Sequence, residues 1–124
     1  DASHAEGYQT QANALGAHAE GFVSIASGQF SHAEGAYTLA SNSYTHAEGY
    51  QTSATTEYSH AEGYTTLASG FQSHAEGASS IASAQSSHAE GGDTRAVGVQ
   101  SHARYAKPLP PLRGVTSLGA PACR

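Results

Sequence analysis

The sequence contains few of the residue types that mark disulfides, nucleic-acid partners or membrane spans. It has a single cysteine, Cys123, which cannot form a disulfide within the chain. Lys and Arg together number five, and Arg95 is the only one in residues 1–100, so no basic patch for nucleic acid exists there. No apolar run approaches the roughly 20 residues of a membrane-spanning helix, and we therefore expect no membrane span.

Large apolar side chains are also scarce. Leu, Ile, Val and Phe account for 15 of the 124 residues. A share below about 20% usually indicates disorder, because such a chain cannot bury enough apolar surface to offset its loss of conformational entropy. The abundant residues, chiefly Ala, Ser, Gly and Thr, nevertheless follow a strict order, which is typical of a repeat protein rather than of a disordered chain.

Histidine recurs at every fourteenth residue, and no histidine lies outside this series. We number each unit so that its histidine is position two. Position one is Ser or Thr except at Ala17, position three is always Ala, position four is Glu except at Arg104, and position five is Gly in the first seven units. Position eight is Thr or Ser, and position ten is Ala, in all seven complete units. The chain is therefore an array of 14-residue repeats.

The alternation of small residues predicts β-strands, because successive side chains of a strand point to opposite faces. Positions one, three and five share one small face, as do eight, ten and twelve, and we expect these faces to pack together inside a coil. His and Glu then point outward from the first half of the unit, and position nine, often Ile or Leu, points outward from the second. We expect turns at positions five to seven and twelve to fourteen.

The resulting prediction is an all-β parallel solenoid over residues 1–103, with rungs about 4.8 Å apart. Its interior buries little apolar area, so we expect one chain to be marginally stable and to need partners. Nine of the ten aromatic residues fall in the expected turns, along the two edges of the coil. Such a stripe serves either packing or ligand binding, and packing is the commoner use.

The pattern S-H-A-E-G-x-x-T-x-A-S-G-x-x resembles the 14-residue head repeat of trimeric autotransporter adhesins, S-V-A-I-G-x-x-x-x-A-x-G-x-x. The resemblance covers residues 1–100. It implies a left-handed parallel β-roll, a homotrimer, and an extracellular, cell-surface or virion-surface location with a host or matrix surface ligand. The family's Val and Ile point out of their own coil toward neighbouring chains. His and Glu occupy those two places here, so the resemblance places the His–Glu series at the trimer interface.

Three hypotheses account for the His–Glu series. In the first, each Glu pairs with a His, chiefly of a neighbouring chain, because an unpaired carboxylate at a dry interface is costly. Such layers specify register and the trimeric state. We expect this pairing to lower the pKa of Glu and to raise that of His.

In the second hypothesis the layers bind a divalent transition metal, zinc first and manganese second, because imidazole and carboxylate groups suit these ions. The candidate ligands are the eight histidines and seven glutamates of the repeats: His4, Glu6, His18, Glu20, His32, Glu34, His46, Glu48, His60, Glu62, His74, Glu76, His88, Glu90 and His102.

The third hypothesis is a metal-dependent hydrolase acting on phosphoesters, with a metal-bound water as nucleophile. A regular ladder is sealed along its length, so the candidate catalytic residues are those at the open end: His88, Glu90 and His102. The sequence contains no G-x-S-x-G, phosphate-loop or H-E-x-x-H motif.

The repeat stops after Ala103, and residues 104–124 form a tail that contains all four prolines. The tail is either a flexible or vector-derived end, or a cap that covers the last rung of the solenoid.

Overall fold

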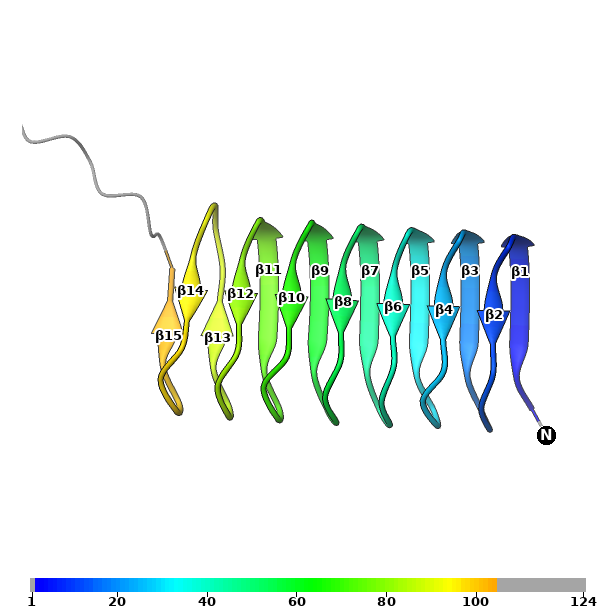
Figure 1. Ribbon diagram of the computed structural model, residues 1–124, viewed down its shortest axis with the longest axis horizontal. Coiled ribbons are helices and arrows are strands. Elements are labelled where there is room, and N and C mark those ends of the chain that lie inside the picture. The colour runs from blue at the N-terminus through cyan, green and yellow to red at the C-terminus, as the bar shows by residue number, and fades with distance from the viewer. Residues whose placement is uncertain (1, 105–124) are drawn as a thin grey trace, which may run out of the picture.

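The computed structural model describes residues 2–104, which form a flattened coil of parallel strands (Figure 1). Each unit contributes a strand that begins at its histidine, and each of the first seven also contributes a two-residue strand at positions nine and ten. The first series is β1 (His4–Tyr8), β3 (His18–Phe22), β5 (His32–Ala36), β7 (His46–Tyr50), β9 (His60–Tyr64), β11 (His74–Ala78), β13 (His88–Ala89) and β15 (His102–Ala103). The second is β2 (Gln11–Ala12), β4 (Ile25–Ala26), β6 (Leu39–Ala40), β8 (Ser53–Ala54), β10 (Leu67–Ala68), β12 (Ile81–Ala82) and β14 (Arg95–Ala96).

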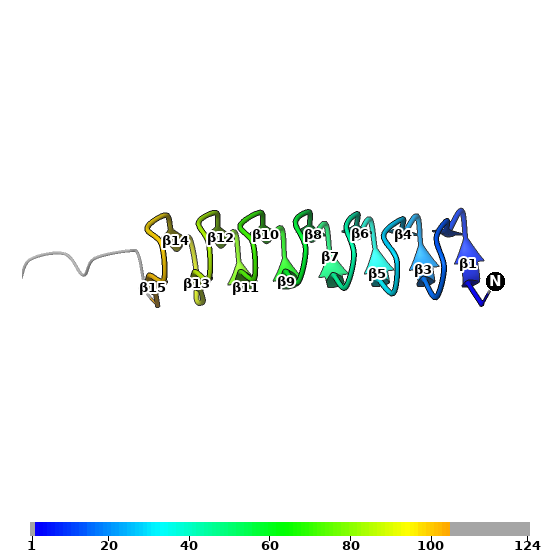
Figure 2. The same ribbon diagram turned by 90° about the horizontal axis from the view of Figure 1, so that it is seen from below.

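The two series form two sheets, one of eight strands in the order β1-β3-β5-β7-β9-β11-β13-β15 and one of seven in the order β14-β12-β10-β8-β6-β4-β2. All pairs are parallel, and the register places each residue beside its equivalent in the next unit, as in His32↔His46 and Glu34↔Glu48. Figure 2 shows the two sheets as the opposite walls of one thin coil. These observations confirm the predicted all-β parallel solenoid with 14-residue rungs. Within residues 2–104 no helix has the length and apolar character needed to cross a membrane.

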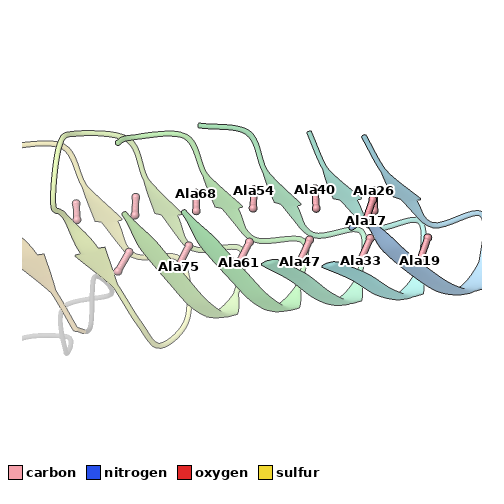
Figure 3. Packing of buried hydrophobic residues seen from close by; sticks show 13 residues of the cluster. Ala17, Ala19, Ala26, Ala33, Ala40, Ala47, Ala54, Ala61, Ala68 and Ala75 are labelled. Carbon is pink, nitrogen blue, oxygen red and sulfur yellow. The ribbon is translucent and has the colours of Figure 1, made fainter. Parts of the chain in front are cut away.

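The core between the sheets is built from alanine, serine and threonine. The alanines at positions three and ten are fully buried from Ala19 to Ala89, and they face each other across the coil (Figure 3). Buried hydroxyl groups at position one bond to the backbone of the preceding turn; Ser31 Oγ, for example, donates to the Gly28 carbonyl oxygen at 2.6 Å. The predicted interior of small residues is therefore confirmed, and two sheets this close together have no room for larger side chains.

Glycine at position five has a different role from the one expected. We expected it to face the interior and to start a turn, but it lies within the long strands β1 to β11 and is exposed. At Gly49 the φ angle is +114°, and a Cβ atom there would lie 2.2 Å from the carbonyl oxygen of Gly63 in the next rung. Glycine is therefore required because the backbones of successive rungs touch at this point.

Each turn contains a residue in the left-handed backbone conformation, at position seven or position fourteen. Val23 (φ 56°), Tyr44 (φ 60°) and Thr65 (φ 53°) are examples that are not glycine. A β-branched residue such as Val23 is strained in this conformation. The turns at positions seven and twelve to fourteen are thus confirmed, whereas positions five and six belong to the strand in the first six units.

The aromatic residues form two ladders along the edges of the coil. Tyr8 and Phe22 stack at 5.0 Å between ring centroids, and so do Tyr44 and Tyr58 at 5.2 Å. Four of the nine aromatics end long strands rather than lie in turns: Tyr8, Phe22, Tyr50 and Tyr64. Four of the seven neighbouring pairs are stacked and three meet edge-on, and both geometries are typical of aromatic packing, which supports packing as the use of the stripe.

The last strand in residues 2–104 is β15, and the predicted end of the repeat domain at residue 103 stays a prediction. The two interpretations of the tail concern residues 105–124, which lie outside the described part of the chain.

Candidate metal centre

The eight histidines form one continuous column on the outer face of the eight-stranded sheet. Each begins a strand of that sheet, and the parallel register places it beside the histidine of the next rung. From His18 to His102 the neighbouring ring centroids are 4.5–4.8 Å apart and the ring planes differ by only 3–7°. The first contact differs, because His4 meets His18 edge-on at 80°. A stack of nearly parallel imidazole rings thus runs along the solenoid.

The glutamates form a second column beside the first. Because Glu follows His by two residues in an extended strand, both side chains lie on the same face. The Nε2 atom of each histidine lies 2.8–3.3 Å from Oε1 of the Glu in its own unit, from His4–Glu6 to His88–Glu90. Each carboxylate therefore contacts a histidine of its own strand, and the expected pairing with a neighbouring chain stays a prediction.

Hydrogen bonding divides the column into two parts. In the first two rungs, Nε2 of His4 and of His18 forms a hydrogen bond of 3.0 Å with the Glu of its unit. In the next five rungs the carboxylate oxygen is as close, but it is not aligned for a hydrogen bond, and Nε2 is buried without any hydrogen-bond partner in residues 2–104. These five nitrogen atoms belong to His32, His46, His60, His74 and His88. These five nitrogen atoms therefore have a carboxylate oxygen in close contact but no aligned hydrogen bond, and a buried polar atom without a hydrogen bond is costly.

The same five histidines begin the groups in which three possible metal ligands come together. Each group joins the His and Glu of one rung with the His of the next, and their ligand atoms lie within 4.8 Å of one another. The groups are His32–Glu34–His46, His46–Glu48–His60, His60–Glu62–His74, His74–Glu76–His88 and His88–Glu90–His102. The structure therefore brings together eleven of the fifteen predicted ligands in such groups and leaves out those of the first two rungs: His4, Glu6, His18 and Glu20.

The last rung has a different set of charged groups. Arg104 takes the place of Glu, and its Nε lies 3.7 Å from Oε2 of Glu90, while Nε2 of His102 lies 3.7 Å from Oε1 of the same carboxylate. Glu90 therefore faces two histidines and an arginine. The sequence shows that Arg104 replaces Glu, but the contact with Glu90 depends on the register of the rungs, and sequence reasoning missed it.

The electrostatic environment favours neutral imidazole at two positions. Burial lowers the pKa of His60 and of His88, and the adjacent histidines of the stack lower it further, since neighbouring rings cannot both carry charge cheaply. The nearby glutamates act in the opposite direction and do not outweigh these effects. The expected rise in histidine pKa is therefore wrong for His60 and His88. A neutral imidazole is the form that binds a metal ion.

The described residues form no cleft or cavity. The candidate catalytic residues His88, Glu90 and His102 do come together, on an open surface. No known family model matches the chain, and a search of curated proteins finds no relative.

Proposed function

We propose that this chain is a structural module of a cell or virion surface. Three copies, each a left-handed β-roll, meet through their His–Glu faces around a threefold axis, and these faces hold divalent metal ions. The observation that carries the proposal is the row of five buried Nε2 atoms without hydrogen-bond partners. Each of these atoms lies 2.8–3.3 Å from a carboxylate oxygen, so a metal ion bound by both groups would give it a partner.

Two further observations support assembly through this face. The core contains no side chain larger than threonine, so a single chain gains little from burial and is stabilised by association. The His and Glu side chains are also half-buried from the third rung onward, although they lie on the outer face of a single chain. A host or matrix surface ligand is the partner we propose for the assembled module.

The donor set favours zinc over manganese. Two imidazole nitrogens and one carboxylate oxygen suit Zn²⁺, and Mn²⁺ is the second candidate because it prefers oxygen ligands. The hydrolase hypothesis has less support, since the described residues form no cleft that would hold a substrate or exclude water from it.

Sedimentation of two charge variants tests the proposed interface. Glu62 lies on the His–Glu face and Leu67 on the outer face of the opposite sheet, and both belong to the same unit. We expect Glu62→Arg to dissociate the trimer and Leu67→Arg to leave it intact, in zinc-containing buffer at neutral pH. A trimer that survives Glu62→Arg but not Leu67→Arg would place the interface on the other sheet. A monomeric native chain would refute the proposal.

A further inference from the structure

The column of histidines also determines where the metal ions lie and how many each chain holds, if the proposed metal binding is correct. We infer that each ion lies between two rungs of one chain, bound by the His and Glu of one rung and by the His of the next. We further infer that groups sharing a histidine exclude each other, so that the five overlapping groups bind at most three ions per chain.

The His and Glu of one strand together supply two ligand atoms, Nε2 and Oε1, for the same ion. Tetrahedral zinc with ligand bonds of about 2.0–2.1 Å has its ligands roughly 3.3 Å apart. The Nε2–Oε1 distances of 2.8–3.3 Å nearly match this value. The nearest third ligand within the chain is the histidine of the next rung, whose ring lies 4.5–4.8 Å away. The fourth position is open to water or to a group of another chain.

Ring orientation explains the exclusion. An imidazole binds a metal ion through a lone pair that lies in its ring plane, and parallel rings direct these lone pairs side by side. Two stacked histidines therefore reach one ion only by tilting toward each other. A ring that tilts toward the rung on one side tilts away from the rung on the other side, so each ring serves a single ion. The groups that begin at His32, His60 and His88 share no residue, which gives three ions.

The first two rungs have the same sequence motif but do not take part. His4 lies edge-on to His18 and does not stack with it. The Nε2 atoms of both residues are already hydrogen-bonded to Glu6 and Glu20. Binding an ion there would first break these hydrogen bonds, whereas the Nε2 atoms from His32 onward have none to break.

Two double variants test the exclusion, because each removes two histidines but a different number of sites. His46→Gln with His74→Gln eliminates every group except the one that begins at His88, so one ion per chain remains. His32→Gln with His46→Gln leaves the three groups that begin at His60, His74 and His88. Only those that begin at His60 and His88 share no histidine, so two ions remain. The control His18→Gln lies outside every group and leaves three ions.

The measurement is a zinc titration of the full chain, purified without a metal-affinity column and followed by native mass spectrometry, with circular dichroism to show that each variant is folded. A competing arrangement places one ion per rung on the threefold axis, and it predicts equal losses in the two double variants. Equal losses, or more than three ions in the native chain, overturn the inference but leave metal binding intact. Absence of any bound zinc overturns both.

Cadmium-113 resonance of the native chain provides a second test that needs no substitution. Three bound-cadmium signals per chain support the inference that groups sharing a histidine exclude each other, because the three non-overlapping groups lie in different surroundings. A signal for every rung contradicts it.

Discussion

The contact between glycines of successive rungs gives a quantitative prediction for Gly49→Ala. The added Cβ would lie 2.2 Å from the carbonyl oxygen of Gly63, so β7 and β9 must separate by about 1 Å to reach an ordinary contact of at least about 3.4 Å. The φ angle of +114° adds about 1–3 kcal/mol of strain for a residue with a side chain. Weakening one or two interstrand hydrogen bonds adds about 1 kcal/mol each. We expect a total loss of about 3 kcal/mol.

Urea unfolding followed by circular dichroism measures this loss. With a slope of about 1–3 kcal/mol per molar urea, the midpoint falls by about 1–3 M. The native chain and the variant must be compared at equal concentration, because association adds to apparent stability. Gly92→Ala is the matched control, since nothing lies within 4 Å of its Cβ position and its φ is not positive. A Gly49→Ala midpoint equal to that of Gly92→Ala would refute the proposed contact between rungs.

Three further predictions concern the core, the turns and the histidine stack. Ala75→Val overfills the thin core and lowers the free energy of unfolding, measured with urea, by about 1–3 kcal/mol. Ala78→Val, on the same strand but exposed, changes it little. Equal effects of the two variants would contradict a tightly packed core. Val23→Asn relieves left-handed strain and adds about 1 kcal/mol, and Val97→Asn, outside that conformation, does not. Because the pKa of His60 is lowered in the fold, the unfolded chain binds protons more readily, so with chelator present the urea midpoint falls as pH drops below about 6.5. A midpoint that does not change between pH 5 and pH 8 would disagree with that sign.

The solenoid was predictable from the sequence because its period is visible in every unit. The strict spacing of histidine gives the length of one rung, and the alternation of Ser, Ala and Gly around it predicts a β-strand at that place. The same alternation suggested that glycine at position five faces the interior, and this was wrong. At Gly49 the constraint comes from the backbone of the next rung, which a single unit read alone does not reveal.

The candidate site was predictable in composition but not in organisation. The motif His-x-Glu is the same at His18 and at His60, yet His18 forms a hydrogen bond with its Glu and His60 has a buried nitrogen without one. His18 has one nearly parallel ring neighbour, His32, whereas His60 lies between two, and a unit read alone does not show this difference. The pKa of His60 is lowered because burial, and after it the adjacent histidines, outweigh the carboxylates.

The central claim is that the His–Glu face binds metal ions where three chains meet. Diffraction from zinc-containing crystals of the full chain, recorded at the zinc absorption edge, tests it most directly because the anomalous peaks locate the ions and the lattice shows the symmetry of the assembly. We expect a line of peaks beside the histidine column from His32 to His102, within an assembly of threefold symmetry. Peaks elsewhere on the chain, or a column of histidines without zinc and facing solvent, would contradict it.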